Sequence, residues 1–328
     1  MKNLTRIESQ KLIEQMMSGE ISQKEMAKIL KDLAQKGETL DEIIGAIYAM
    51  RSHMKSIQAP NSSVDTCGTG GDGKNTFNIS TAAALVVAGA GVPVVKHGNR
   101  KASSKCGSAD VLEELGVNIN LKPYQAEEIL ESIGIVFLFA PIYHPAMAQV
   151  VPIRKQLGIR TIFNFLGPFC NPARVRRQVI GVPNLEVLET LSHVATELEY
   201  KYLALVTSRD GIDEISPTAP SFIRIIKNSH VSSLQIDPKK YGIHHVSLDD
   251  IIGGDARKNA SMIHSVLSGK KGTLRDTVLL NAAMTLLVSG KALDMNHGIE
   301  LASKSIDSGA AKNILKALIH SSNNHEHS

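Results

Sequence analysis

The sequence predicts an α/β protein in which a small N-terminal helical bundle precedes a large α/β domain with a mainly parallel central sheet. Residues 1–60 carry apolar side chains at helical spacing and show no strand signal. From Val64 onward, short β-branched runs alternate with helical stretches, which is typical of parallel strands covered by helices. Between them lies Ala59–Ser63, a linker by composition. We therefore expect domains at residues 1–63 and 64–328.

The first domain should contain three or four helices. Ser22 and Thr39 are predicted N-caps, because acidic residues follow each within the first turn. A bundle of this size can barely bury its own core, so its remaining apolar face should pack on the main domain or on a second subunit. The apolar positions at three- and four-residue spacing are Leu12, Ile13, Met16, Met17, Met26, Ile29, Leu30, Leu33, Ile43, Ile44, Ile47, Tyr48, Met50 and Met54.

In the second domain, strands and helices alternate along the chain. The expected helices include Ala82–Ala90 and Glu186–Glu199. Ligands of such sheets bind beyond the carboxyl ends of the strands, so we expect the loops that follow the strands to form the site. The β-branched runs that predict the strands are Val92–Val95, Ile133–Phe139, Tyr202–Val206 and Phe222–Ile226.

Composition excludes several classes of protein. With 43% hydrophobic and 21% charged residues among 328, the chain is typical of globular proteins. Its net charge of +4 is too small to demand nucleic acid but suits a polyanionic small substrate. Three scattered cysteines argue against a disulfide framework or zinc site and for a reducing compartment. The N-terminus lacks a signal-peptide pattern and no apolar run has transmembrane length, so we expect a cytoplasmic protein without membrane contact.

A glycine-rich strip, DTCGTGGDGKNTFNIST at Asp65–Thr81, is the most informative segment. Its four glycines permit positive φ and let a ligand approach bare backbone N–H groups. Such groups at a helix N-terminus bind phosphate. Asp72 and Lys74 add a possible metal-side carboxylate and a cation. The spacing matches neither GxGxxG nor GxxxxGK[ST], so the strip predicts a different kind of phosphate loop.

A second anion-binding loop is expected at Lys96–Asp110, between a strand and a helix. Lys96 and Arg100 offer positive charge, while His97 and Asn99 offer directional hydrogen bonds. The segment Gly107–Asp110 resembles the cap of the following helix. Two such loops about thirty residues apart suit a ligand that carries more than one phosphate.

Motifs along nearly the whole chain resemble those of the anthranilate phosphoribosyltransferase family. This family transfers the phosphoribosyl group of PRPP to the amine of anthranilate in tryptophan biosynthesis, releasing pyrophosphate. The resemblance implies a fold of the nucleoside phosphorylase and phosphoribosyltransferase type. In order, the motifs are GTGGD (Gly68–Asp72), NIST (Asn78–Thr81), KHGNR (Lys96–Arg100), GSADVLEELG (Gly107–Gly116), HPAM (His144–Met147), VPIRKQLGIRTIFNFLGP (Val151–Pro168), DGIDE (Asp210–Glu214) and RDTVLLNAA (Arg275–Ala283).

The resemblance implies residue roles for both substrates. Mg²⁺ is the implied cofactor, held by Asp213 and Glu214 with Ser80 on the pyrophosphate side. The implied PRPP-binding residues are Gly68, Thr69, Gly70, Gly71, Asp72, Thr76, Asn78, Ser80, Thr81, Lys96 and Ser108. The implied anthranilate-binding residues are Gly68, His97, Asn99, His144, Arg154 and Pro168.

Each role has a structural alternative. An Asp-Glu pair in a loop is commonly a solvated turn, and Arg154 could be a surface arginine of its helix. His97 could be a buried histidine bonded to backbone, and Pro168 could fix a turn. No general base is assigned, because a neutral aryl amine is itself nucleophilic. The resemblance also implies a homodimer through the N-terminal domain, joined by a helical segment near residues 165–185.

One departure from the family pattern concerns the acidic turn. Where the family usually has His-Gly, this chain reads Thr207-Ser208. The resemblance therefore does not predict how the loop that carries Asp213 and Glu214 bends. Two other functions remain to be weighed. A pyrimidine-nucleoside phosphorylase shares the architecture, but KHGNR, Arg154 and the Asp213-Glu214 pair oppose it. A nucleic-acid-binding paralogue without transferase activity would need a strongly basic groove, which the near-balanced charge opposes.

Overall fold

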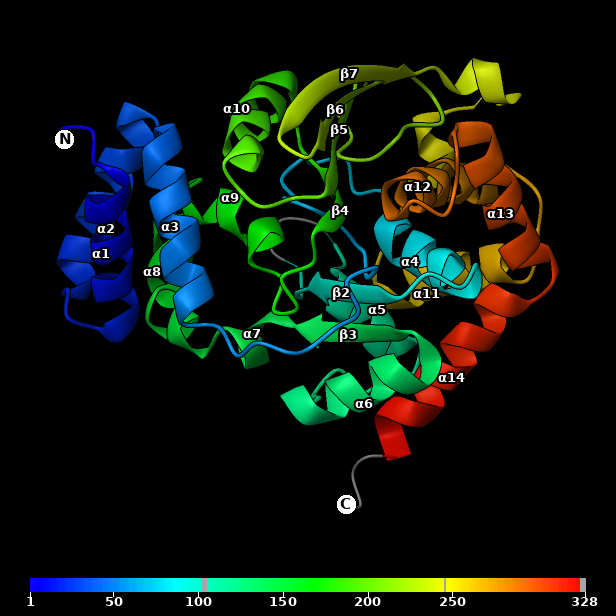
Figure 1. Cartoon of the computed structure of the whole chain (residues 1–328), viewed down its shortest axis with the longest axis horizontal. Coiled ribbons are helices and arrows are strands. Elements are labelled where there is room, and N and C mark those ends of the chain that lie inside the picture. Colours follow the sequence, from blue (N-terminus) through cyan, green and yellow to red (C-terminus); the bar gives the residue numbers. More distant parts are fainter. Residues whose placement is uncertain (102–104, 245, 325–328) are drawn as a thin grey trace.

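A bundle of three helices forms the N-terminal part of the computed structural model, which describes residues 1–101, 105–244 and 246–324 (Figure 1). The helices are α1 (Arg6–Ser18), α2 (Gln23–Lys36) and α3 (Leu40–Ser52). Both predicted N-caps are confirmed, since the side chains of Ser22 and Thr39 accept backbone N–H groups of the first turn. These caps are local interactions, which explains why the sequence reveals them.

A later segment of the chain covers the bundle. It consists of α7 (Ala140–Tyr143), η1 (Pro145–Gln149), α8 (Val151–Leu157), α9 (Phe163–Leu166) and η2 (Gly167–Cys170). Side chains of α1 and α3 share one hydrophobic cluster with those of α8, α9 and α10 (Leu185–Thr196). The apolar face of the bundle therefore packs on the main part of the chain. This helical segment begins before the expected 165–185, and residues 177–181 within that range form a strand.

Within the residues that the structure describes, seven strands build the sheet region. Five strands lie in the order β1-β4-β5-β6-β7, and β2 pairs with β3 in a two-stranded sheet. A parallel bridge between Val64 and Val94 links the two sheets. Pairs β1–β4, β4–β5 and β2–β3 are parallel. The strands are β1 (Asp65–Gly68), β2 (Val94–Gly98), β3 (Ile135–Phe139), β4 (Arg177–Gly181), β5 (Tyr202–Ser208), β6 (Ser221–Lys227) and β7 (His230–Ile236).

The four predicted strands all occur, and the prediction of a mainly parallel sheet is confirmed by the pairs β1–β4, β4–β5 and β2–β3. The exception is the edge made of β5, β6 and β7, which form an antiparallel meander. No helix separates β5 from β6, and parallel neighbours need a crossover connection that is usually a helix. Strands β1, β4 and β7 had no sequence prediction of their own.

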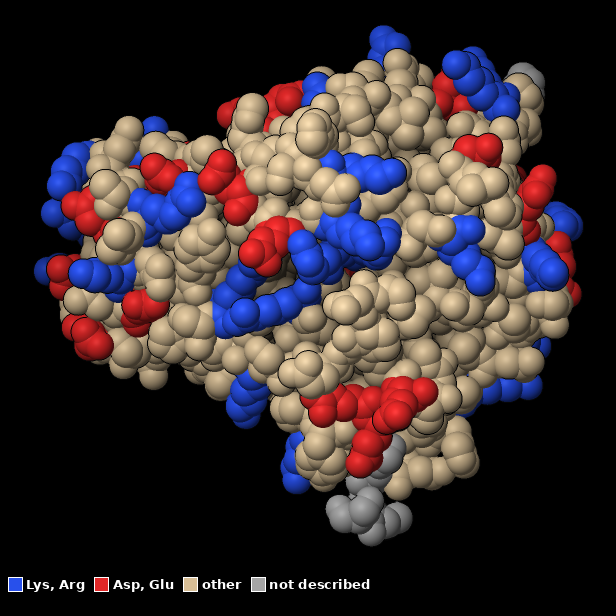
Figure 2. Space-filling view, viewed as in Figure 1, with Lys and Arg blue, Asp and Glu red and all other residues tan. Residues whose placement is uncertain are grey.

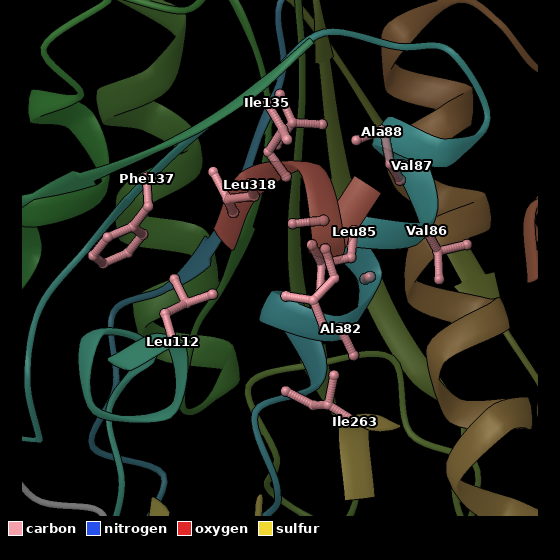
Figure 3. Close-up of a cluster of buried hydrophobic side chains, with 14 of the residues drawn as sticks. Ala82, Leu85, Val86, Val87, Ala88, Leu112, Ile135, Phe137, Ile263 and Leu318 are labelled. Atoms are coloured by element: carbon pink, nitrogen blue, oxygen red, sulfur yellow. The ribbon is translucent and has the colours of Figure 1, made fainter. Parts of the chain in front are cut away.

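Helix α4 (Ile79–Gly89) lies in the middle of the largest core cluster. Figure 3 shows its side chains surrounded by Leu112 of α5, Ile135 and Phe137 of β3, Ile263 of α11 and Leu318 of α14. Since α4 is apolar on all sides, it must be buried. The remaining elements are α5 (Ser108–Glu114), α6 (Pro123–Ile133), η3 (Pro238–Tyr241), η4 (Leu248–Ile251), α11 (Ala256–Leu267), α12 (Thr273–Ser289), α13 (Met295–Asp307) and α14 (Ala310–Asn324).

Burial of α4 fixes the position of its N-terminus. The helix begins at Ile79, near the end of the glycine-rich strip, whose middle part connects the carboxyl end of β1 to the helix. The carboxyl ends of the parallel strands β4 and β5 lie at the same edge of the sheet. The loops after all three strands can therefore meet there. Within the described ranges, no helix has the length and apolarity needed to cross a membrane.

Candidate active site

The glycine-rich strip forms an open loop between β1 and α4. Gly70, Gly71 and Gly73 have φ values of 70°, 90° and 68°, a region that side chains with a Cβ rarely adopt. The loop is tied down at both ends, where Thr69 N donates to Gly181 O at 2.9 Å and Phe77 N donates to Ile251 O at 2.9 Å. Bare backbone and a helix N-terminus thus occur together, as an anion site requires.

The acidic turn Asp210–Glu214 packs directly on the ends of two strands. A Cβ on Gly181 of β4 would lie 1.5 Å from the carbonyl oxygen of Asp213, and a Cβ on Gly68 of β1 would lie 2.5 Å from its Oδ2. No other residue type fits at Gly181, because the contact is with rigid backbone. Glycine at both strand ends therefore lets the acidic pair reach the phosphate loop.

Ser80, Lys96 and Glu214 come together from α4, β2 and the loop after β5. Lys96 is buried, and its Nζ donates to Thr66 O at 2.6 Å and to Ser80 Oγ at 3.3 Å. The backbone N–H of Ser80 donates to Glu214 Oε1 at 3.1 Å. The NIST, KHGNR and DGIDE motifs thus meet at one place, although Ser80 and Glu214 are 134 residues apart.

The two carboxyl groups of the acidic pair are in an unfavourable environment. Burial raises the pKa of Asp213, and the neighbouring Asp72 raises it further. Burial also raises the pKa of Glu214, with repulsion from Asp213 added and attraction to Lys96 opposing it. Asp72 Oδ2 is itself buried without a hydrogen-bond partner among the described residues. A cation beside these oxygens would relieve the repulsion.

The donor set fits a hard divalent cation only in part. Carboxylate and hydroxyl oxygens suit Mg²⁺, which prefers oxygen ligands and keeps several waters. The described ranges contain no group of three or more His, Cys, Asp or Glu side chains arranged to hold a metal ion alone. Residues Asp213, Glu214 and Ser80 therefore fit an ion that reaches the site together with substrate phosphates. They do not form a closed metal cage.

A pair of buried histidines forms a second part of the site. The ring centroids of His97, on β2, and His144, before η1, are 5.1 Å apart. Burial lowers the pKa of His97 well below its usual value and that of His144 to about 4. Each ring also donates to a backbone carbonyl, His97 to that of Gly167 and His144 to that of Cys170, and these bonds oppose the shifts. Both imidazoles are therefore neutral at pH 7, and η2, which contains Pro168, lies against them.

Arg154 is held on α8 by neutral groups. Its Nη2 donates to Asn164 Oδ1 at 3.3 Å, and its Cζ lies 5.6 Å from the ring centre of Phe163. Burial lowers its pKa, although the group stays charged. No acidic side chain within the described ranges forms an ion pair with it. Its charge is therefore available to a carboxylate from outside the chain.

Other predicted site residues have mixed environments. Asn99 is exposed, and its carbonyl accepts the Ser108 hydroxyl at 3.3 Å, which closes the second loop onto α5. Thr76 pairs with Ile252 in an isolated bridge. Thr81 is almost fully buried on the inner side of α4. Residues 102–104 of the second loop lie outside the described residues.

Arg100 does not offer free charge to a ligand, contrary to the expectation from sequence. Its Nη2 donates to Glu113 Oε1 at 2.8 Å, and its Nη1 forms further ion pairs with Glu113 and Asp110. Asp110 and Glu113 belong to α5 and lie ten and thirteen residues after Arg100 in the chain. Their carboxylates neutralise the charge of the Arg100 guanidinium. Lys96 is thus the cation of this motif that points toward the phosphate loop.

Sequence reasoning missed residues that position the site from a distance. Asn259 of α11 donates to Asn78 Oδ1 at 2.8 Å, although the two are 181 residues apart. Buried Asp65 accepts from Asn171 Nδ2 at 2.9 Å and from Gln178 Nε2 at 3.1 Å, and Gln178 also donates to Pro168 O at 2.8 Å. This network ties η2 to β1 and β4. No local pattern marks these residues.

The site does not coincide with a cleft that lies nearby on the surface. A cleft of about 650 Å³ lies at the N-terminus of α10 and the end of β5, and none of the predicted site residues lines it. Its lining is Pro183, Asn184, Leu185, Glu186, Thr207, Ser208, Arg209, Gly211, Pro220, Phe222 and Gln235.

Basic and acidic side chains both lie on the face shown in Figure 2. Lysine and arginine gather near its middle, acidic side chains gather at its lower edge, and both kinds are interspersed over the helical bundle. Nucleic-acid binders instead concentrate positive charge along one surface. The mixture of signs agrees with the modest net charge of +4.

A helical bundle joined to an α/β domain, with a glycine-rich loop at the sheet edge, is the arrangement of one class of glycosyltransferases, which the family matches show for this chain. The family described as "Glycosyl transferase family, helical bundle domain" matches residues 1–54, and "Glycosyl transferase family, a/b domain" matches residues 60–312. Among curated relatives, the anthranilate phosphoribosyltransferase of Bradyrhizobium diazoefficiens is 46% identical over 98% of this chain and 95% of its own. That of Desulforamulus reducens is 45% identical over 97% and 92%.

Solved structures agree with these relatives. Anthranilate phosphoribosyltransferase from Thermus thermophilus has a TM-score of 0.91 and 35% identity, covering 98% of this chain and 97% of that one. The Saccharomyces cerevisiae enzyme in complex with PRPP and Mg has a TM-score of 0.90 and 26% identity, covering 98% and 94%. This chain belongs to the anthranilate phosphoribosyltransferase family. The phosphorylase and nucleic-acid-binding alternatives have no support in these comparisons.

Proposed function

We propose that this chain transfers the phosphoribosyl group of PRPP to the amine of anthranilate, giving N-(5-phosphoribosyl)anthranilate and pyrophosphate. The meeting of Ser80, Lys96 and Glu214 beside the glycine-rich loop is the observation that carries the proposal. Relatives named for this reaction match nearly the whole chain. One of the similar solved structures contains PRPP and Mg, and another contains 4-fluoroanthranilate.

The phosphate groups of PRPP are assigned to the loop between β1 and α4. Phosphate charge is held by the ammonium of Lys96 and by backbone N–H groups of the Gly68–Gly71 segment, apart from the N–H of Thr69, which donates to Gly181 O. Asp72 and Asn78 orient the ribose and pyrophosphate, and Asn259 holds Asn78 in place. Thr69, Thr76, Thr81 and Ser108 complete the proposed set.

Asp213, Glu214 and Ser80 are assigned to Mg²⁺. A bound Mg²⁺ neutralises charge on pyrophosphate and so makes it a better leaving group. The chain's part is to keep two carboxylates close together in a buried place. Lys96 contributes there as well, because its positive charge opposes the repulsion felt by Glu214.

The acceptor is assigned to the region of His97, His144 and Arg154. A planar guanidinium matches a carboxylate through two parallel hydrogen bonds, and Arg154 has no acidic partner within the described ranges. Asn99 and Pro168 border the same region, with Gly68 between the two substrates. The Nε2 atoms of both histidines are buried without a protein partner among the described residues, as expected for groups that face a polar ligand.

Positioning and charge stabilisation account for the proposed catalysis. Both histidines remain neutral at pH 7, so they add no positive charge beside the ribose and the amine, where positive charge develops in the transition state. The aryl amine is neutral and nucleophilic without a strong general base. Its attack on C1 accompanies departure of pyrophosphate, through a transition state with oxocarbenium character like that of glycosyl transfer. Holding both reactants close together and correctly oriented lowers the activation free energy by several kcal/mol, on the order of 7–11 kcal/mol in ideal cases.

The purified protein is expected to consume anthranilate only when PRPP and Mg²⁺ are both present. Loss of anthranilate fluorescence should match pyrophosphate release mole for mole. Omitting Mg²⁺ with a chelator is the control for metal dependence. Turnover of thymidine or uridine with phosphate, without any turnover of anthranilate, would contradict the proposal.

The protein is further proposed to be a homodimer through a small domain of residues 1–63 and the helical segment packed on it. Ile7 on α1 and Leu40 on α3 remain 67% and 38% exposed. The Arg6–Asp41 ion pair at 3.1 Å brings the neighbouring residues of these two helices together. Much of the bundle's apolar surface is already buried against α8, α9 and α10, so this exposed patch is what remains for a partner.

Light scattering at micromolar concentration is expected to give twice the chain mass. Ile7→Asp should shift the population toward monomer, because it places a charge in the proposed contact. Leu293→Asp is the matched control, since Leu293 is 84% exposed in the large domain. A wild-type monomer would rule out the dimer, and equal effects of the two variants would rule out this contact.

A cytoplasmic location is also proposed. The free thiols at Cys67 and Cys170 support it, because thiols stay reduced in that compartment.

A further inference from the structure

Ser208 ends β5, at the place where the sequence departs from the family pattern. It is only 5% exposed. Its Oγ donates to the backbone carbonyl of Glu214 at 2.6 Å and lies 2.5 Å from Ser221 Oγ. A carbonyl can only accept, so the single proton of Ser208 is used on Glu214 and Ser221 donates to Ser208. The N–H of Ser216 is shared between both hydroxyls, at 3.2 and 3.0 Å.

The segment that follows the acidic pair is anchored at successive polar groups. Asn281 of α12 bonds both the N–H and the carbonyl of Ile215, at 2.9 and 3.0 Å. Asp210 Oδ2 accepts from Ser216 Oγ at 2.6 Å and from the hydroxyl of Thr218. The carbonyl of Glu214 is held by Ser208. The turn is therefore held by protein groups at each step, unlike a solvated turn.

Such anchoring matters because the acidic pair repels itself. Two buried carboxylates on adjacent residues lower their energy by moving apart, and low dielectric strengthens that tendency. Gly68 and Gly181 fix the position of Asp213 by close contact. The peptide group between Glu214 and Ile215 is instead held by hydrogen bonds at both ends: Ser208 Oγ donates to the Glu214 carbonyl, and the Ile215 N–H donates to Asn281 Oδ1. Of these two partners, Ser208 is the one that bonds Glu214 itself.

We propose that Ser208 is a positioning residue that holds the Glu214 carboxylate beside Asp213 for the cation, a role that rests on the proposed function of the acidic pair. The hydroxyl acts through its hydrogen bond to the Glu214 carbonyl, which fixes the backbone that carries this carboxylate. Its effect should therefore appear in cation affinity, with little effect on folding beyond that of any buried hydroxyl.

Ser221 provides a matched control. Ser208 and Ser221 face each other across β5 and β6, both are buried, and they bond each other and Ser216 N–H. Only Ser208 also bonds Glu214. Replacing either serine by alanine removes one buried hydroxyl, so the two variants should lose similar thermal stability. Any difference in cation binding then reports the bond to Glu214.

The test is Mn²⁺ binding in the presence of PRPP and without anthranilate, with bound ion measured by electron paramagnetic resonance. Ser208→Ala should weaken Mn²⁺ binding about fivefold, as expected for one neutral hydrogen bond, and Ser221→Ala by less than about twofold. Half-saturating Mg²⁺ for turnover should rise in the same ratio, with kcat at saturating Mg²⁺ close to wild type. If Ser208→Ala does not fold, Ser208→Cys, a weaker donor, should shift Mn²⁺ binding in the same direction.

Two results separate this inference from the function on which it rests. In the first, Asp213→Asn/Glu214→Gln binds Mn²⁺ poorly, which supports the proposed cation site. If Ser208→Ala then binds Mn²⁺ as wild type does, or if Ser221→Ala weakens binding by as much as Ser208→Ala, the role of Ser208 is overturned and the cation site stands. If that double variant binds Mn²⁺ as tightly as wild type, the proposed cation site is wrong and the role of Ser208 is overturned with it.

Discussion

The double variant Asp213→Asn/Glu214→Gln is expected to lose about 10²- to 10³-fold in kcat/KM at low Mg²⁺. Metal-assisted charge stabilisation is worth several kcal/mol, and each 1.36 kcal/mol is a factor of ten. The amides keep the size of the side chains but remove both anionic ligands. Rates measured over a Mg²⁺ series should show a higher half-saturating concentration or no saturation at all.

The same variant should fold at least as well as wild type. Burial raises the pKa of both carboxyl groups above their ordinary values of 3.8 and 4.5, with repulsion from Asp72 added at Asp213 and repulsion from Asp213 added at Glu214. As pH rises above that ordinary range, ionisation costs more in the folded than in the unfolded state, so the metal-free wild type loses stability. The double variant lacks these two groups and should lose less. Thermal unfolding from pH 4 to pH 8 without metal tests this sign.

An exposed acidic pair supplies the control for charge. Asp249 and Asp250 are adjacent, exposed and located in η4. Asp249→Asn/Asp250→Asn changes net charge by the same amount as the test variant, and its Mg²⁺ dependence should match wild type. Equal Mg²⁺ dependence in all three proteins would show that Asp213 and Glu214 form an ordinary turn.

Arg154→Ala is expected to raise the KM for anthranilate and to leave PRPP binding nearly unchanged. Loss of a charge-assisted bidentate contact costs about 2–3 kcal/mol, which is roughly 30- to 150-fold in kcat/KM. The neutral setting of Arg154, between Asn164 and Phe163, gives it no other charge to satisfy. Lysine should restore activity only in part, because it lacks the planar fork. Steady-state kinetics with each substrate varied in turn provides the measurement.

Arg160 is a close control for this prediction. It also stacks on a phenylalanine of α9, with its Cζ 4.2 Å from the Phe165 ring centre, but its side chain is exposed. Arg160→Ala should change either KM by less than about twofold, as exposed substitutions usually do. Equal losses for both substrates in Arg154→Ala would instead assign Arg154 to the phosphates or to the fold.

Sequence alone identified the elements whose signals are local. The caps at Ser22 and Thr39 depend on residues three positions away, and the helical bundle depends on apolar spacing within single helices. The GTGGD strip needs glycine because positive φ is a property of one residue at a time. Motif order carried the family resemblance along the whole chain. These features were therefore readable without any structure.

Tertiary structure decided everything that depends on residues distant in the chain. Whether Arg100 is free or paired depends on how α5 folds back, and the antiparallel order of β5 and β6 depends on the connection between them. The close approach of Asp213 to Gly181 and the bond from Ser208 to Glu214 arise only when the strand ends are brought side by side. Ligand-binding chemistry was thus present in the sequence as motifs. Its geometry came from packing, because contacts between distant segments leave no periodic or local signal.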